Sequence, residues 1–85
     1  MYFLYVLECS DGTLYTGITL DLERRIEEHN SSNLGAKYTR GRKPVKLAFS
    51  QEFVDRSQAS KEEARIKKLS REAKLGLIKT HSINI

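Results

Sequence analysis

The chain begins with an apolar run, which is followed by a turn signal and a second strand-like segment. Residues Tyr2 to Glu8 are apolar at nearly every position and rich in aromatic and β-branched side chains, which predicts a central strand buried on both faces. The tripeptide Ser10-Asp11-Gly12 is a hairpin signal. Residues Thr13 to Ile18 form the predicted return strand, with Gly17 near its end.

The length of this hairpin loop decides which tyrosines share a face of the sheet. With a two-residue turn at Asp11-Gly12, Tyr5 and Tyr15 project from opposite faces, because side chains alternate along strands. With a three-residue loop at 10–12 and a left-handed glycine, Tyr5 faces Gly17 and Tyr15 lies on the same face. The sequence permits two tyrosines on one face, with a glycine opening space beside them.

A helix is predicted from about residue 20 or 21 to residue 29, with Thr19 or Asp21 as its cap. Leu22 and Ile26 form its apolar stripe. At 3.6 residues per turn, Arg25 and His29 share the inward half of the helix with that stripe, whereas Arg24, Glu27 and Glu28 point elsewhere. Taken singly, His29 is typical of a satisfied interior histidine and Arg25 of a snorkelling arginine.

The second half of the chain predicts one strand and two helices. Residues Val45 to Phe53 alternate as a strand, and a helix capped by Ser57 runs to about Leu69. Ser70 caps a last helix to about Lys79, and the tail THSINI is either loosely held or an edge strand. The order β-β-α-β-α-α predicts a small α/β protein, with a three-stranded, mainly antiparallel sheet packed with helices. We expect a single domain over residues 1–80 and a tail over residues 81–85.

One carboxylate lies within the apolar face of the predicted second helix. Glu63 follows Ala59 by four residues and precedes Ile66 by three, while Glu62 sits at the border of that face. A carboxylate on a buried stripe is costly unless it is paired or bound to a metal. Glu63 is therefore either a rim residue in a salt bridge or a metal ligand.

Composition and charge narrow the classes of function. The 85 residues include one cysteine, which excludes an intramolecular disulfide and metal sites built from several cysteines. The longest apolar run is far short of the roughly 20 residues that span a bilayer, and it lacks the features of a signal peptide. We therefore expect a cytoplasmic protein without a membrane partner.

The positive charge is concentrated in one segment. The formal net charge is +4, and no Asp or Glu occurs between His29 and Gln51. This basic loop, residues 37–46, is either a solubilising loop or a phosphate-contacting loop with a tyrosine to stack on a base. Its candidate nucleic-acid-binding residues are Lys37, Tyr38, Arg40, Arg42 and Lys43.

Phosphodiester hydrolysis suits the polar residues gathered so far, provided that both helices pack on the tyrosine face. A single carboxylate can hold Mg²⁺ together with water and phosphate oxygens, and arginine matches phosphate geometry with two hydrogen bonds. A phenol or an imidazole can take the proton from an attacking water. A free phenol has a pKa of about 10 and imidazole one of about 6.5, and the sequence leaves the choice of base open.

The motifs FLY (Phe3 to Tyr5) and LYTGITLDLERRIEEHN, followed by a glutamate in a later helix, resemble the GIY-YIG nuclease superfamily, above all its small stand-alone bacterial members of a single domain. The resemblance extends through GAKYTRGRKPVKL and EEARIKKLSR to cover almost the whole chain. The first triplet lacks its glycine, and threonine replaces isoleucine in the second. Both triplets keep their tyrosines.

The resemblance implies a role for each matching residue. The two tyrosines belong to the motif triplets, the arginine binds the scissile phosphate, the histidine lies near the reacting water, and the glutamate binds the metal. These implied catalytic residues are Tyr5, Tyr15, Arg25, His29 and Glu63, with Gly17 as a structural part of the motif.

The resemblance also implies a function. It implies an endonuclease that depends on Mg²⁺ or Mn²⁺, held weakly without substrate, and that cleaves DNA rather than RNA, including branched or damaged DNA. Targeting would come from the basic loop, from a protein partner or from low specificity. The alternative is a nucleic-acid-binding module that uses residues 37–46 without catalysis.

Overall fold

The computed structural model describes residues 1–31 and 41–83, and among them the side chains of residues 1–30 and 41–79. The element order β-β-α-β-α-α and the antiparallel three-stranded sheet, with strand order β2-β1-β3, confirm the predicted fold class. No helix among the described residues is long and apolar enough to cross a bilayer. The elements are β1 (Tyr2–Glu8), β2 (Leu14–Thr19), α1 (Leu22–Ser31), β3 (Lys46–Phe53), α2 (Arg56–Lys67) and α3 (Arg71–Ile83).

The hairpin between β1 and β2 has the three-residue loop. The Cys9 amide donates a hydrogen bond to the Thr13 carbonyl at 2.9 Å, and the Gly12 amide donates to the Cys9 carbonyl at 2.9 Å. Gly12 has a φ of 84°, in the left-handed region that glycine adopts without a steric penalty. Tyr5 consequently pairs with Gly17, and the condition for a shared tyrosine face is met.

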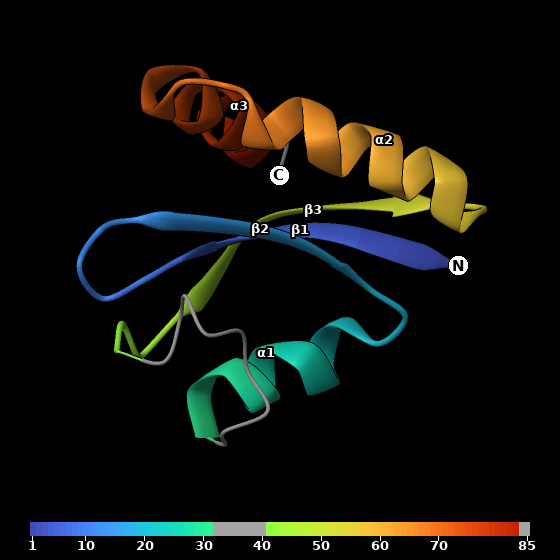
Figure 1. Ribbon diagram of the computed structural model, residues 1–85. Helices are drawn as coiled ribbons and strands as arrows, with labels where there is room; N and C mark the ends of the chain where they lie inside the picture. Colours follow the sequence, from blue (N-terminus) through green and yellow to red (C-terminus); the bar gives the residue numbers. More distant parts are fainter. Residues whose placement is uncertain (32–40, 84–85) are drawn as a thin grey trace.

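The helices cover both faces of the sheet. Figure 1 shows α1 on one side and α2 with α3 on the other. Leu4 and Val6 of β1 pack with Ile66 of α2, whereas Tyr5 and Leu7 pack with residues of α1. The condition that both helices pack on the tyrosine face is therefore not met. The reason is the apolar character of β1, because a strand buried on both faces needs cover on both.

The helix caps are partly as predicted. Asp21 caps α1, since the Arg24 amide donates to its carboxylate at 3.1 Å. Ser70 caps α3 by accepting from the Ala73 amide at 3.1 Å. The cap of α2 is Asp55 rather than Ser57: its carboxylate accepts from the backbone amide three residues on, at 2.8 Å. Ser57 already lies inside the helix because Asp55, two residues earlier, is also a strong capping residue.

The C-terminal segment differs from both expectations for it. Helix α3 continues to Ile83 and includes residues 80–83 of the predicted tail. These residues are neither a loose tail nor an edge strand.

On β2, the threonine of the second triplet, Thr16, is 3% exposed, and its hydroxyl has no hydrogen-bond partner within the described part of the chain.

Candidate active site

A phenol and an imidazole meet in the interior, on the face of the sheet that α1 covers. The hydroxyl of Tyr5, from β1, lies 3.2 Å from Nε2 of His29, from α1. Both side chains are almost fully buried, with 1% and 0% of their surface exposed. The predicted inward orientation of His29 is confirmed, and its partner is one of the motif tyrosines.

Tyr15 completes a cluster of three rings. Its ring centroid lies 6.3 Å from that of Tyr5 and 5.4 Å from that of His29. Tyr15 pairs with Leu7 on β1, two residues after Tyr5, so the strand register places both phenols on one face. Three side chains that the sequence singled out from two strands and one helix therefore converge.

Gly17 makes room for this cluster. A Cβ atom at this position would lie 2.6 Å from the hydroxyl oxygen of Tyr5 and 2.8 Å from its Cζ. Real Cβ atoms do not approach other atoms so closely, so any other residue here must move the tyrosine ring. The ring of Tyr5 therefore extends across the glycine of the neighbouring strand, and the motif glycine has a steric role.

Arg25 lies on α1 one turn before His29 and borders the ring cluster. Its side chain is 26% exposed, and its Nη1 donates to Glu28 at 2.9 Å. Glu28 also accepts from the exposed Arg24 at 3.2 Å, and the sequence analysis did not predict this pairing of Glu28 with both arginines. The i,i+3 and i,i+4 spacings of these charges were the available signal. An open hollow of about 270 Å³ adjoins this charged group, between α1 and the end of β2.

The surroundings set the protonation of the buried pair. Burial raises the pKa of Tyr5, a hydrogen bond with Arg25 opposes this, and the charges of Tyr15 and Glu63 add to the increase. Burial also lowers the pKa of His29 below 6.5, and the positive charge of Arg25 lowers it further. Near neutral pH the phenol is therefore protonated and the imidazole neutral. With the ring proton on Nδ1, Tyr5 donates this hydrogen bond and Nε2 of His29 accepts it.

Glu63 approaches from the opposite layer. It lies on α2, with 23% of its side chain exposed, and forms an ion pair with Lys67 at 3.3 Å. Its charge contributes to the raised pKa of Tyr5, so the carboxylate acts electrostatically on the ring cluster. The neighbouring Glu62 is engaged differently, because it binds Arg65 through both oxygens, at 2.7 Å from Nε.

The donor set fits a divalent cation that binds together with substrate. Among the described residues no group of three or more His, Cys, Asp or Glu could hold an ion. Mg²⁺ in phosphoryl-transfer sites uses one or two carboxylates plus substrate phosphate oxygens and waters. Glu63 supplies one partly exposed carboxylate of this kind, and an incoming cation would compete with Lys67 for it.

The predicted basic loop contributes little that can be placed. Lys37, Tyr38 and Arg40 lie outside the described residues. Arg42 pairs with Asp11 of the hairpin loop at 2.9 Å, and Lys43 is half-buried. The structure therefore places the end of this loop against the β1–β2 hairpin.

The sequence analysis missed Asn30, which fixes the end of α1 to β3. Its side-chain oxygen accepts from the Val45 amide at 2.6 Å, and its side-chain nitrogen donates to the Val45 carbonyl at 3.0 Å. Val45 is buried in the same cluster as Tyr5. Asn30 directly follows His29, so this clamp holds the helix turn that carries the imidazole. Nothing in the local sequence identifies a partner fifteen residues away.

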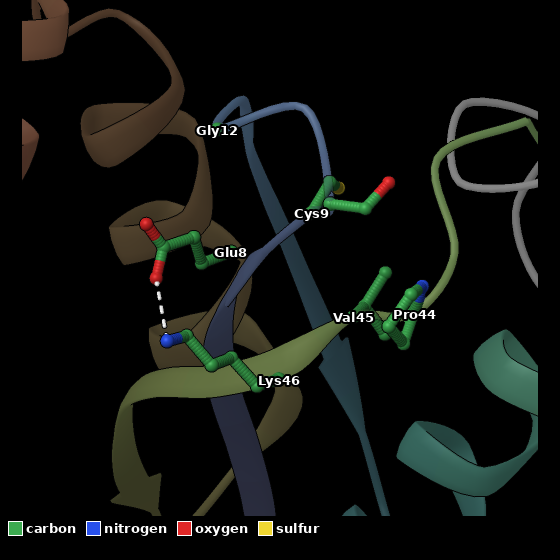
Figure 2. Close-up of a pocket in the computed structure, with 7 residues that line it drawn as sticks. Glu8, Cys9, Gly12, Pro44, Val45 and Lys46 are labelled. Carbon is green, nitrogen blue, oxygen red and sulfur yellow. Dashed lines mark ion pairs between the residues drawn. The ribbon is translucent and has the colours of Figure 1, made fainter.

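A hollow larger than the one beside Arg25 lies elsewhere. It measures about 330 Å³ and is bounded by the hairpin loop and the start of β3. Figure 2 shows the ion pair of Glu8 and Lys46, at 3.4 Å, among its lining residues, together with Cys9. It contains none of the ring cluster. Size alone therefore does not identify the site in this protein.

The chain is similar in sequence to a known family and to several known proteins. The GIY-YIG catalytic domain family matches residues 1–75. The chain is 55% identical to the UPF0213 protein DP2720 of Desulfotalea psychrophila, over 92% of this chain and 71% of that protein. It is 54% identical to the UPF0213 protein SAG0778 of Streptococcus agalactiae, over 93% and 89%.

A solved structure supports the same relationship. The solution NMR structure of the UPF0213 protein BH0048 from Bacillus halodurans is 44% identical to this chain and superimposes with a TM-score of 0.61, covering 94% of this chain and 85% of that one. A nuclease family with a nucleic acid substrate is thereby indicated. With the two motif tyrosines, their glycine and the helical arginine and histidine in one place, the chain belongs to the GIY-YIG family.

Proposed function

We propose that this protein is a metal-dependent endonuclease that hydrolyses phosphodiester bonds in DNA, including branched or damaged DNA. The observation that carries the proposal is the buried hydrogen bond between Tyr5 and His29 beside Arg25. A phenol joined to a neutral imidazole forms a proton acceptor, and a guanidinium next to it attracts a phosphate. A role in DNA repair follows if damaged DNA is the substrate.

The scissile phosphate would bind at the edge of the sheet. Strand β2 is an edge strand, and the Tyr5 hydroxyl lies over its Gly17. Both Arg25, on the α1 side, and Glu63, on the α2 side, act electrostatically on Tyr5, and a phosphate at this edge would lie between them. The division of the proposed catalytic residues between two layers is then a requirement of the site, because the substrate enters between them.

The proton path follows from the protonation states. As a water oxygen attacks phosphorus, its proton passes to the Tyr5 oxygen while the Tyr5 proton moves to Nε2 of His29. The bond from phosphorus to the leaving oxygen breaks, and this oxygen departs with the bonding electron pair and takes up a proton from solvent. The imidazolium that has formed then releases its proton to solvent. Arg25 binds the non-bridging oxygens, whose charge increases in the transition state. Tyr15 packs against both proton carriers and restricts their movement.

Glu63 would hold Mg²⁺ or Mn²⁺ once the substrate phosphate completes the ligand set. When bound, such an ion polarises the phosphate and stabilises the leaving oxygen. The binding of the free protein to the cation would be weak, since one carboxylate contributes and Lys67 competes for it.

The test is nicking of supercoiled plasmid and of a branched DNA junction in Mg²⁺, with chelator as a blank. Arg25→Lys and Glu63→Gln should each lower the rate about 100-fold or more, as is typical when one group that stabilises the transition state is removed. Glu62→Gln is the matched control and should cleave at the wild-type rate, since that carboxylate binds Arg65. If wild-type protein and both variants cleave equally, the activity is a contaminant and the enzyme proposal fails. Salt-sensitive binding without cleavage would instead favour the binding-module alternative.

A further inference from the structure

A second hollow adjoins the one beside Arg25. It measures about 230 Å³ and is lined by Tyr2, Ile18, Thr19, Leu20 and Arg56. Thr19 and Leu20 also line the hollow next to Arg25, so the two share a wall. Figure 1 shows the N-terminus, the start of α2 and the β2–α1 connection at the same end of the sheet. A strand bound at Arg25 can therefore continue into this second hollow.

The shared wall presents an apolar side chain in a fixed position. Leu20 is 65% exposed, although it lies in a turn whose backbone is ordered. The Asp21 amide donates to the Thr19 hydroxyl at 3.2 Å, and Asp21 in turn caps α1. Met1 and Val54, also highly exposed, flank the ends of the neighbouring strands. A single exposed leucine is ordinary on a protein surface, and here the turn holds it in the wall that the two hollows share.

Arg56 is placed where the fold itself does not need a cation. It is exposed and makes no hydrogen bond or ion pair with the described residues. It also lies in the first turn of α2, where the helix dipole disfavours positive charge. Its guanidinium is therefore available to an external anion at the edge of the hollow that it lines.

We propose that the hollow formed by Tyr2, Leu20 and Arg56 binds the DNA nucleotide next to the scissile phosphate. The base would lie against Tyr2 and Leu20, and its phosphate would pair with Arg56. The hollow is smaller than the roughly 300–1,000 Å³ of a closed small-molecule site, which suits one base at an open surface. This inference rests on the proposed nuclease function, since it names the structure of the substrate for that same site.

A preference among substrates follows. A base can reach an aromatic side chain only after it leaves the duplex stack, and that step costs least where the base is already unpaired. The protein therefore cleaves DNA with an unpaired nucleotide beside the cut in preference to continuous duplex.

The experiment compares a DNA flap junction with a fully paired duplex of the same sequence, by cleavage at varied substrate concentration. The wild-type protein should favour the flap by roughly tenfold in kcat/KM, in line with the energy of stacking one base. Tyr2→Ala should lose most of this preference through KM, whereas Tyr2→Phe should keep it. Leu20→Ser, an exposed change that spares folding, should lose part of it.

Arg56 is tested for its charge. Arg56→Ala should raise KM a few-fold on both substrates and reduce the salt dependence of binding by about one charge. Lys61→Ala, an exposed cation on the same helix outside the hollow, is the control and should change neither. Equal flap preference in wild type, Tyr2→Ala and Leu20→Ser, with Arg56→Ala matching Lys61→Ala, would overturn the proposal.

A binding arm separates this proposal from the nuclease proposal. Fluorescence anisotropy with the same two DNAs in chelator needs no cleavage. If the wild-type protein does not cleave but binds the flap more tightly through Tyr2 and Arg56, the nuclease proposal fails and the subsite remains. If it cleaves without preference, the subsite fails alone.

Discussion

Helices α1 and α2 approach the proposed reaction centre from opposite faces of the sheet, and they hold their functional side chains differently. On the α1 side, Tyr5 and His29 are buried and hydrogen-bonded to each other. On the α2 side, Glu63 is partly exposed, and its ion-pair partner among the described residues is Lys67, one turn further along the helix. In the proposed mechanism, the proton-transfer half of the site thus forms when the protein folds. The metal half of the proposed site would be completed when substrate binds.

This difference has a physical origin. A buried phenol and imidazole need fixed partners, because an unpaired polar group in the interior costs about 1–3 kcal/mol. A carboxylate near the surface is solvated and exchanges partners at little cost, since exposed ion pairs contribute at most about 1 kcal/mol. Substitutions on the α1 side should therefore change both stability and cleavage, and those on the α2 side mainly cleavage.

The largest effect is expected at Gly17. In Gly17→Ala the new methyl group would lie 2.6 Å from the Tyr5 hydroxyl oxygen and 2.8 Å from its Cζ. The free energy of unfolding should therefore fall by about 1–3 kcal/mol, as for other overpacked cores. Displacement of the phenol should lower cleavage about 100-fold. Gly76→Ala is the control: nothing lies within 4 Å of its added methyl group, and alanine in a helix is favoured by about 1 kcal/mol. Denaturant unfolding of both variants tests this; equal stabilities would contradict the steric role of Gly17.

Asn30→Ala should have the next largest effect. It removes both side-chain hydrogen bonds to Val45 and leaves a buried amide and carbonyl unpaired, so we expect a loss of about 2 kcal/mol in unfolding free energy. Cleavage should also fall, because the turn of α1 that carries His29 is released. Removal of the exposed amide of Gln58, as Gln58→Ala, should change stability by less than about 0.5 kcal/mol. If the two variants unfold alike, the clamp is not what holds α1.

The α1 side and the α2 side also differ in how well the sequence predicts where their residues lie. Strand alternation made a shared face for Tyr5 and Tyr15 conditional on a three-residue loop, and the structure has that loop. Helix phase was sufficient to direct His29 inward. These are local, periodic constraints. The layer in which α2 packs is a long-range property, and local periodicity indicates only that Glu63 lies near an apolar stripe. It cannot say against which face of the sheet that stripe packs.

The side-chain contacts were predicted least well. Glu28 was expected to point away, yet it binds Arg25 at 2.9 Å because half-exposed charges three residues apart on a helix meet readily. Asn30 bonds to a strand fifteen residues away across the basic loop, and no sequence period reports such a contact. Both residues support the α1 side of the site.

The pH dependence of stability should distinguish the buried imidazole. Because the pKa of His29 is lowered in the folded protein, the unfolded chain binds the proton more readily, and stability falls as pH drops below about 6.5. The carboxylates with lowered pKa values, Asp11, Glu28 and Glu62, lose their contribution only below about pH 4.5. Urea unfolding between pH 7.5 and 5.5 should therefore show a decline in the wild-type protein that is weaker in His29→Gln. Parallel curves would mean that another group titrates.

The smallest effect is expected on the α2 side, at Lys67. Lys67→Ala frees the carboxylate of Glu63, so the Mg²⁺ concentration for half-maximal cleavage should fall by up to about fivefold, the equivalent of one exposed ion pair. Lys68→Ala removes the next positive charge, which makes no ion pair with Glu63, and controls for the general loss of charge. Both should be measured at saturating DNA, so that weaker DNA binding does not obscure the cation dependence. Lys67 is exposed, and the ion pair given for it is with Glu63 and not with the ring cluster. The free energy of unfolding of Lys67→Ala should therefore stay within about 0.5 kcal/mol of wild type. An equal shift of the half-maximal Mg²⁺ concentration in both variants would mean that charge density, and not competition for Glu63, sets the metal requirement. The contrast between a preformed half and a substrate-completed half of the site would then rest on the α1 side alone.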